Sequence, residues 1–397
     1  MKTIASLTLA LCASVTLAAC GGSSDNTTAS TTQATNTVRI GLEGPLTGAQ
    51  KVTGVGMLNG AKLAADKLNA KGGLLGKNIE IVPIDDAADA TTGVSAANAA
   101  IESGLDGVVG PYNSTVGIKT LPLYEKDGLT PIRLTSDSAT NGMGYTLQPM
   151  DYQIAPVATT ALTDWLKVKS AAIAYDPTPG YTATVAASMK KLLTDAGVKL
   201  TSYEAVKPGA SSYASTVSKL EADNPDVIYS VVYFPEGGLI AKAMNSSSSK
   251  VKCVADYASA DPGFVTTAGK AAAQNCPVVG VPSPGDFPNG GSFDAAYEKQ
   301  FGEGPGTWSS YVYDSVNLLA TCVKQAGGFD KTTSSETPTK LETCLNETKD
   351  WKGVTGSVTI DPKNGNRDPA TVVVLETDAN GQLHVDQSWA TAVDAPY

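Results

Sequence analysis

The stretch from Val38 to Asp86 most constrains what this chain can fold into. Val38–Leu42 is a short, largely apolar run, which is typical of a buried strand. A helix is expected from about Gly54 and should end at Gly72-Gly73, because glycine adopts the left-handed cap conformation without steric cost. A second strand, Ile79–Ile84, completes a strand–loop–helix–strand unit. This order predicts an open, parallel α/β sheet.

The same alternation continues along the chain. Strands are expected at Asp106–Gly110 and Leu129–Leu134, and a second α/β unit of similar layout begins near Pro149. After Pro282 the chain is expected to return to the first unit. A chain of 397 residues is too long for one core, so we expect lobe 1 to comprise residues 38–150 plus 283–355 and lobe 2 to comprise 151–282 plus 356–397.

Composition excludes several classes of protein. With 42% hydrophobic and 17% charged residues the chain is globular, and its net charge of −10 argues against nucleic-acid binding. Outside the N-terminus no apolar run approaches the roughly 20 residues that a spanning helix needs. Gly54, Gly56 and Gly60 miss the dinucleotide-binding spacing by one residue, and no P-loop occurs, so we expect no cofactor.

The N-terminus has the features of a targeting segment. Residues 1–19 combine Lys2, the apolar run Ile4–Leu17 and a small-residue cleavage site. Leu17-Ala18-Ala19-Cys20 resembles the bacterial lipobox, in which the cysteine is lipidated; the competing interpretation is an ordinary secretory signal with an incidental cysteine. Residues 20–37 form a Ser/Thr-rich tether. We therefore expect an extracytoplasmic body anchored to the bacterial cell membrane through a lipid on Cys20.

Four cysteines remain in the body, at Cys253, Cys276, Cys322 and Cys344. An even number in an exported protein suggests disulfides, and local pairing would join Cys253 to Cys276 and Cys322 to Cys344, although the connectivity stays open. Zinc binding is the competing interpretation. No C-x-x-C motif occurs and His384 is the only histidine, so we expect no metal site.

Hydroxyl side chains recur directly after the predicted strands. Thr47, then Ser114 and Thr115, and then Ser136–Ser138 follow three of them. Helix N-capping would explain any one of these residues. Because the carboxyl ends of parallel strands meet at one edge of a sheet, the recurrence predicts a shared polar pocket.

Short motifs along the whole body match a known family. In chain order they are Gly44-Pro45-Leu46-Thr47-Gly48, Asn59-Gly60-Ala61, Leu68-Asn69-Ala70-Lys71-Gly72-Gly73, Asp85-Asp86, Val108-Val109-Gly110-Pro111, Tyr233-Phe234-Pro235-Glu236-Gly237 and Tyr313-Asp314. From about Val38 to Glu376 the chain resembles the branched-chain amino acid-binding (Leu/Ile/Val-binding) family of ABC transporter substrate-binding proteins. The resemblance implies the type I periplasmic binding protein fold: two Rossmann-like lobes with parallel-sheet cores, joined by three crossovers, that close on a ligand.

The resemblance also implies a set of ligand-binding residues. They are Thr53, Asn113, Ser114, Thr115, Ser136, Asp137, Ser138, Tyr181, Tyr233 and Asp256. The hydroxyl-bearing loops would hold a ligand carboxylate, Thr53 would line the side-chain end, and Asp256 would receive an ammonium group. Asp256 could instead be a solvated turn residue, and the two tyrosines could be packing aromatics. Asp137 departs from the family pattern, since its charge would repel a ligand carboxylate unless it points away or the ligand carries its charge differently.

The sequence therefore favours a lipid-anchored, monomeric receptor that binds a small polar ligand and delivers it to an ABC permease complex. A branched-chain amino acid is the leading ligand, and an amide, urea or aromatic acid is the alternative. A ligand sensor without transport is a third hypothesis. An enzyme is disfavoured, because the chain has no G-x-S-x-G motif and His384 is expected in an exposed tail.

Overall fold

The computed structural model describes residues 37–247, 249–288, 290–331 and 337–395. The predicted signal peptide (1–19), the predicted lipidation site Cys20 and all of the predicted tether (20–37) except Thr37 lie outside the described residues. Within the described ranges, no helix combines the length and the apolar character needed to cross a membrane.

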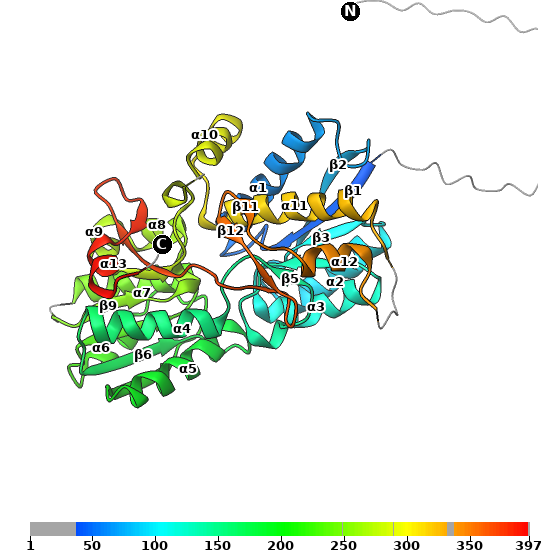
Figure 1. Cartoon of the computed structure of the whole chain (residues 1–397). Helices are drawn as coiled ribbons and strands as arrows, with labels where there is room; N and C mark the ends of the chain where they lie inside the picture. Colours follow the sequence, from blue (N-terminus) through cyan, green and yellow to red (C-terminus); the bar gives the residue numbers. More distant parts are fainter. Residues whose placement is uncertain (1–36, 248, 289, 332–336, 396–397) are drawn as a thin grey trace, which may run out of the picture. The chain divides into compact units, whose positions relative to one another are not determined.

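The first lobe is built on a seven-stranded sheet with the order β13-β14-β5-β4-β3-β1-β2. Figure 1 labels β1, β2, β3 and β5 of this sheet. Every neighbouring pair in it is parallel except β13–β14. Its strands are β1 (Thr37–Gly44), β2 (Asn78–Asp85), β3 (Gly107–Val109), β4 (Pro131–Arg133), β5 (Tyr145–Thr146), β13 (Ile360–Asp361) and β14 (Asn366–Arg367). Its helices are α1 (Lys51–Asn69), α2 (Ala90–Glu102), α3 (Ser114–Lys126), η1 (Ser138–Thr140), α10 (Gly290–Phe301), α11 (Thr307–Ala326) and α12 (Lys340–Asn346). A two-stranded ribbon, β11 (Trp351–Gly353) and β12 (Gly356–Val358), completes it.

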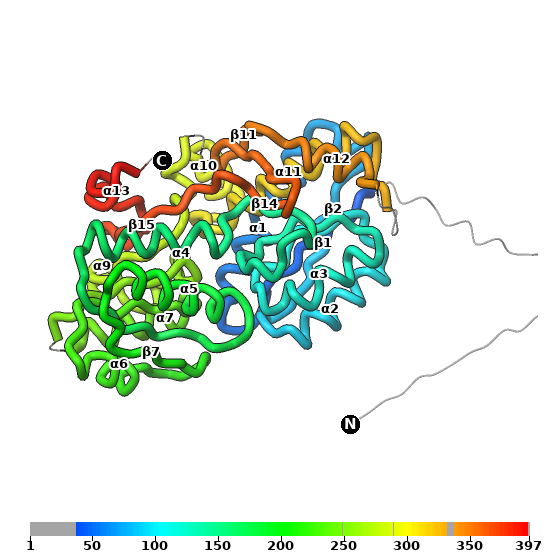
Figure 2. Tube along the Cα trace, turned by 60° about the horizontal axis from the view of Figure 1, so that its bottom comes forward, coloured from blue at the N-terminus to red at the C-terminus, as the bar shows by residue number. Residues whose placement is uncertain are grey.

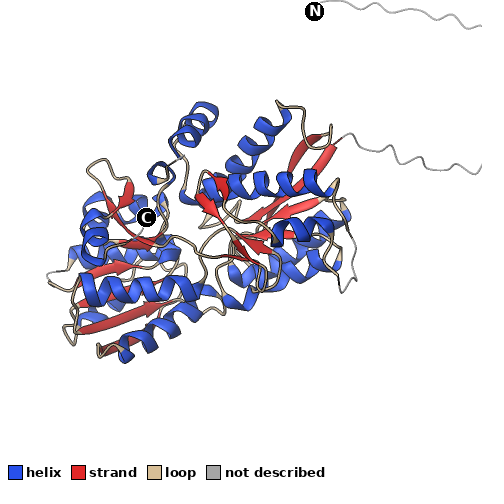
Figure 3. Ribbon diagram, in the orientation of Figure 1, coloured by secondary structure: helices blue, strands red, loops and turns tan. Residues whose placement is uncertain are grey.

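The second lobe repeats this plan on another seven-stranded sheet, with the order β16-β15-β10-β9-β8-β6-β7. Its strands are β6 (Ser170–Tyr175), β7 (Lys199–Ala205), β8 (Val227–Val231), β9 (Lys252–Ala255), β10 (Val278–Gly280), β15 (Val373–Thr377) and β16 (Leu383–Val385). Its helical segments are α4 (Asp151–Thr160), η2 (Ala161–Trp165), α5 (Tyr181–Asp195), α6 (Ala214–Glu221), α7 (Phe234–Ser246), η3 (Tyr257–Ser259), α8 (Pro262–Ala268), α9 (Lys270–Gln274), η4 (Pro284–Asp286) and α13 (Gln387–Val393). Helices flank the strands of both sheets (Figure 3). The predicted parallel α/β architecture is confirmed.

The opening unit forms as predicted, with one shift at its helix. Strand β1 is buried along most of its length, and α1 begins at Lys51, earlier than the predicted Gly54. A Cβ on Gly54 would lie 2.1 Å from the carbonyl oxygen of Pro45, and a Cβ on Gly60 would lie 2.3 Å from that of Ser309 in α11. Both distances are too short for any side chain. Glycine therefore lets the loop after β1 and helix α11 pack directly against α1.

The chain crosses between the lobes three times. It enters the second lobe after β5, returns after β10, and crosses a last time between β14 and β15 (Figure 2). This last crossing differs from the boundary expected at residue 356. Strands β13 and β14 belong to the first sheet, where Asn366 lies opposite Thr146. The crossing therefore falls between Arg367 and Val373, because the buried Arg367 donates to the carbonyl oxygen of Leu147 and is held in the first lobe.

The four cysteines of the body form two disulfides. Cys253 pairs with Cys276 in the second lobe, and Cys322 of α11 pairs with Cys344 of α12 in the first lobe. Both disulfides join the cysteines that are expected to pair when each bonds its neighbour in the sequence.

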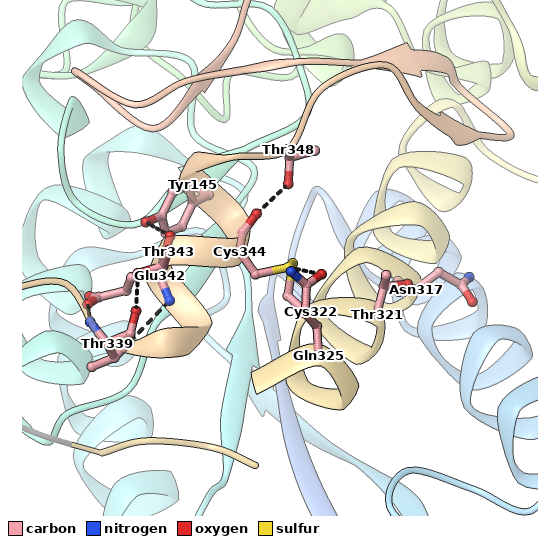
Figure 4. The surroundings of a disulfide bond; sticks show 10 residues. All are labelled: Tyr145, Asn317, Thr321, Cys322, Gln325, Thr339, Glu342, Thr343, Cys344 and Thr348. Atoms are coloured by element: carbon pink, nitrogen blue, oxygen red, sulfur yellow. Dashed lines mark hydrogen bonds between the residues drawn. A yellow bond between two sulfur atoms is a disulfide. The ribbon is translucent and has the colours of Figure 1, made fainter. Parts of the chain in front are cut away.

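Helix α12 has further attachments around its disulfide (Figure 4). The N–H of Glu342 donates to Oγ1 of Thr339 at 3.1 Å, and the N–H of Thr339 donates to the Glu342 carboxylate at 2.8 Å, which makes a capping box. The hydroxyl of Tyr145 in β5 donates to the carbonyl oxygen of Glu342 at 3.3 Å. The helix is thus fixed to α11 and to the sheet at once.

Candidate functional site

The carboxyl ends of strands from both sheets border a small cavity between the lobes, with a volume of about 10 Å³. The first lobe contributes Tyr112, Ser114, Leu134, Ser136 and Gln148, and the second contributes Tyr181, Tyr233, Tyr257 and Ala258. Each residue follows or ends a strand, or begins the helix after it. This is where ligands bind in open parallel sheets.

The N-terminus of α3 supplies uncommitted backbone donors beside the cavity. Asn113 occupies the N-cap position, but its side chain makes no capping bond and donates instead to Oε1 of Gln50 at 3.0 Å. The first N–H groups of a helix have no partner within the helix, and the helix dipole favours an anion there. Ser114 lines the cavity, and its Oγ accepts from the N–H groups of Ser136 and Asp137, each at 3.2 Å. These two hydrogen bonds hold the loop after β4 against the N-terminus of α3.

Two buried polar atoms on the cavity residues are unsatisfied. The Gln148 amide donates to Oγ of Ser136 at 2.9 Å and to the carbonyl oxygen of Leu134. Among the described residues, Oε1 of Gln148 and the hydroxyl of Tyr257 have no hydrogen-bond partner of normal geometry. Buried polar groups are normally paired in proteins, so these two atoms could bond a ligand.

Aromatic rings from both lobes surround the cavity. Tyr112 lies 6.0 Å from Tyr233 and 5.6 Å from Trp308 between ring centroids, while Tyr257 lies 5.1 Å from Trp308 and 5.6 Å from Tyr181. Tyr112 and Trp308 belong to the first lobe and the other three to the second. Burial raises the pKa of each of these tyrosines above the ordinary value, so all remain neutral hydroxyls.

Asp256 lies behind the cavity wall. The hydroxyl of Tyr181 donates to its Oδ2 at 2.8 Å, and the hydroxyl of Tyr229 donates to its Oδ1. The same side chain caps η3 by accepting from the N–H of Ala258. Asp256 is fully buried, and this burial raises the pKa of its carboxyl although the tyrosine hydrogen bonds act in the opposite direction. The structure thus places Tyr181, and not Asp256, on the cavity surface.

Asp137, the departure from the family pattern, points away from the cavity. Its Oδ1 accepts from the N–H of Ala139 at 2.7 Å and caps η1, and its Oδ2 accepts from the hydroxyl of Thr184 in α5 at 2.8 Å. The neighbouring Ser138 donates through its N–H and its hydroxyl to Asp151. Neither Asp137 nor Ser138 lines the cavity. The Asp137 carboxylate therefore serves a cap and a contact between the lobes.

Two other predicted residues also link the lobes. The hydroxyl of Thr53 in α1 donates to Oδ2 of Asp261 at 2.7 Å, and the hydroxyl of Thr115 donates to the carbonyl oxygen of Pro179 at 3.0 Å. Asp261 caps α8 of the second lobe. Of the predicted residues, Ser114, Ser136, Tyr181 and Tyr233 line the cavity. Asn113 and Asp256 do not line it, and each forms side-chain hydrogen bonds within its own lobe.

The sequence interpretation missed five cavity residues. They are Tyr112, Leu134, Gln148, Tyr257 and Ala258. Tyr112 and Tyr257 directly adjoin the predicted Asn113 and Asp256. The strand-end rule would have found both, had aromatic residues been counted together with polar ones.

His384 differs from its expected position in an exposed tail. It lies in β16, half-buried, with Nδ1 at 3.2 Å from Oδ1 of Asp286. No group of three or more His, Cys, Asp or Glu side chains in the described part of the chain could hold a metal ion.

Comparisons with known proteins bear on the family of this chain. The family model described as "Periplasmic binding protein" matches residues 37–382. The Leu/Ile/Val-binding protein homolog 2 of Brucella abortus is 29% identical over 336 residues, which cover 82% of this chain and 86% of the relative.

Solved structures show the same fold. A leucine binding protein, LivK, from Thermotoga maritima superimposes with a TM-score of 0.79 at 20% identity, covering 88% of this chain and 97% of the other. A solute binding protein of an ABC transporter from Rhodopseudomonas palustris, in complex with 3,4-dihydroxy benzoic acid, gives a TM-score of 0.75 at 21% identity, covering 88% and 96%. The chain has the two-lobed type I fold and belongs to the periplasmic binding protein family.

Proposed function

We propose that this protein is a lipid-anchored receptor that binds a small organic acid in the cavity between its lobes and delivers it to an ABC permease. Its family consists of extracytoplasmic solute-binding receptors of the branched-chain amino acid transporter type. The observation that carries the proposal is the shared cavity, whose wall both lobes provide and which the N-terminus of α3 adjoins.

The proposed binding mode places the ligand carboxylate at the first N–H groups of α3, beside Ser114 and Ser136. Backbone donors and a helix dipole stabilise a negative charge in this position. The remainder of the ligand then lies among the rings of Tyr112, Tyr233 and Tyr257. A ligand that contacts both lobes favours the arrangement in which they meet.

Two ligand classes are supported by different observations. The names of the relatives favour a branched-chain amino acid, whose ammonium group would have to reach Asp256 past Tyr181. The aromatic lining favours an aromatic acid or a similar ligand instead. The fold does not decide between them, because a leucine binding protein and a protein in complex with 3,4-dihydroxy benzoic acid share it.

Calorimetry and thermal unfolding test the binding function. The Cys20→Ala variant should be exported without an anchor, and it should bind one small carboxylate per chain without converting it. If no amino acid, amide or organic acid binds or raises its melting temperature, the receptor function is wrong.

The anchor and the partner need separate tests. The wild-type protein should incorporate labelled fatty acid and fractionate with the membrane, whereas Cys20→Ala should not. Pull-down of a permease complex supports transport, and pull-down of a sensor kinase instead would support signalling without transport.

A further inference from the structure

The wall of the cavity carries no charged side chain among the described residues. Its polar groups are the hydroxyls of serine and tyrosine and the amide of Gln148, and Leu134 and Ala258 complete it. Burial is the main cause that raises the pKa of each of these tyrosines, so they remain neutral hydroxyls. A ligand cation would therefore meet only neutral acceptors, such as the unpaired Oε1 of Gln148.

Three buried carboxylates, Asp256, Asp261 and Asp137, act on the cavity tyrosines and already accept hydrogen bonds within the protein. Both oxygens of Asp256 accept tyrosine hydroxyls, from Tyr181 and Tyr229, and the side chain is 0% exposed. Asp261 accepts from the hydroxyl of Thr53 at 2.7 Å and from the N–H of Gly263 at 2.8 Å.

Asp137 is bonded to Thr184 and to the N–H of Ala139. None of the three carboxylates lines the cavity. An ammonium group buried there would have no ion partner, and burying an uncompensated charge is strongly unfavourable.

The N-terminus of α3, which adjoins the cavity through Ser114, does suit an anion. The N-terminus of α3 offers backbone donors and a positive dipole end, and Asn113 leaves them uncapped. Ser114 and Ser136 lie beside them on the cavity wall. One negative charge on the ligand is therefore compensated, whereas one positive charge is not.

We propose that the ligand is a small carboxylic acid with an apolar or aromatic body and no ammonium group, and that α-amino acids are bound weakly or not at all. This inference rests on the proposed receptor function and specifies its ligand class. The tyrosine rings would contact the body of the ligand.

Matched pairs of ligands test the inference directly. Each pair shares one carbon skeleton and differs only in the α-ammonium group: 3-phenylpropionate with L-phenylalanine, and 4-methylpentanoate with L-leucine. Calorimetry on the full chain in detergent should show at least tenfold tighter binding of the acid without the ammonium group. Equal or tighter binding of either amino acid overturns the inference and leaves the receptor function intact.

A wider screen covers ligands outside the two pairs. If neither pair binds, the best solute found in the screen decides: a ligand without an ammonium group supports the inference, and one with it overturns it. If no small solute binds at all, the receptor function is wrong and this inference falls with it.

A substitution on the wall provides a second test. Tyr257→Glu places a carboxylate on the cavity surface and should shift the preference at least tenfold toward the amino acid of each pair. Tyr257→Phe is the matched control and should keep the preference of the wild-type protein. If a folded Tyr257→Glu variant shows the same ratio of affinities within each ligand pair as the wild-type protein, the proposed geometry is wrong. If that variant does not fold, the wild-type pairs still decide.

Discussion

The hydroxyl of Thr53 in α1 donates a 2.7 Å hydrogen bond to Oδ2 of Asp261, which caps α8 in the other lobe. Both side chains are buried, and the bond exists only when the two lobes meet. A hydrogen bond that forms only when the lobes are together stabilises that state. It therefore increases the apparent affinity of any ligand that binds that state preferentially. Thr53 was expected to line the ligand pocket, but the structure gives it this linking position instead.

Thr53→Val should therefore weaken ligand binding without abolishing it. The change keeps the shape of the side chain and removes one hydrogen bond to a carboxylate, for which a net loss of about 1.5–3 kcal/mol is typical. We expect roughly a 10- to 100-fold rise in Kd by calorimetry. Thr194→Val is the control, because that exposed hydroxyl bonds only within its own helix, to the carbonyl oxygen of Lys190. Wild-type affinity in Thr53→Val would show that the link does not contribute to binding.

The sequence predicted the fold well where hydrophobic patterns were local. The strand–helix–strand unit from β1 to β2 follows from two short apolar runs and the glycine pair that ends the helix between them. The last crossing was not predictable in the same way. Strands β13 and β14 have two residues each, and β14 is defined by its pairing with β5, which is distant in sequence. Such short strands carry no periodicity of their own.

The position of the candidate cavity follows from the strand-end rule, but the makeup of its wall does not. The strand-end rule indicated Ser114 and Ser136, the family resemblance indicated Tyr233, and all three line the cavity. It could not show that Asp256 would be covered by Tyr181, because a sequence does not reveal which neighbouring side chain lies in front. Rings are as common in cores as in ligand sites, so Tyr257 gave no separate signal.

Tyr181→Phe should destabilise the second lobe, because it removes the 2.8 Å hydrogen bond to Oδ2 of Asp256. Hydrogen bonds to charged groups contribute about 1.5–3 kcal/mol, so we expect a loss in this range in urea unfolding at pH 8. The bond favours the ionised carboxyl, and its removal raises the pKa of Asp256 further. The loss should shrink at pH 4, where a protonated carboxyl does not need the donor. An equal loss at both pH values would mean that the carboxyl of Asp256 does not change its protonation state between them.

Asp86 should make the first lobe more stable in mild acid than in base. Burial is the main cause that raises the pKa of its carboxyl to about 7, and the charges of Asp85 and Asp89 add to it. Between its ordinary pKa of 3.8 and about 7, the folded protein holds a proton that the unfolded chain has released. Stability is therefore lost as the pH rises through this window, by about 1.4 kcal/mol per unit of pKa shift.

Asp86→Asn tests this dependence. The amide oxygen can still accept the N–H of Ala88, which now bonds Oδ1 at 2.8 Å, while the titrating group is gone. The variant should melt at a higher temperature than wild type at pH 8 and show a flatter profile from pH 5 to 8. Asp195→Asn, at an exposed carboxylate beside Lys191, should leave the wild-type profile unchanged. A profile in Asp86→Asn as steep as in wild type would assign the slope to other groups, such as the buried Glu43.

The two disulfides should stabilise the protein independently. Their sequence separations are 23 and 22 residues, and each closed loop of this size is worth about 3 kcal/mol in the chain-entropy model. Replacing either pair by alanine should lower the free energy of unfolding in urea by about that amount. The pairs lie in different lobes and share no partner, so the losses should add in the variant that lacks both. A combined loss well below the sum would show that the lobes unfold separately, each limited by its own disulfide.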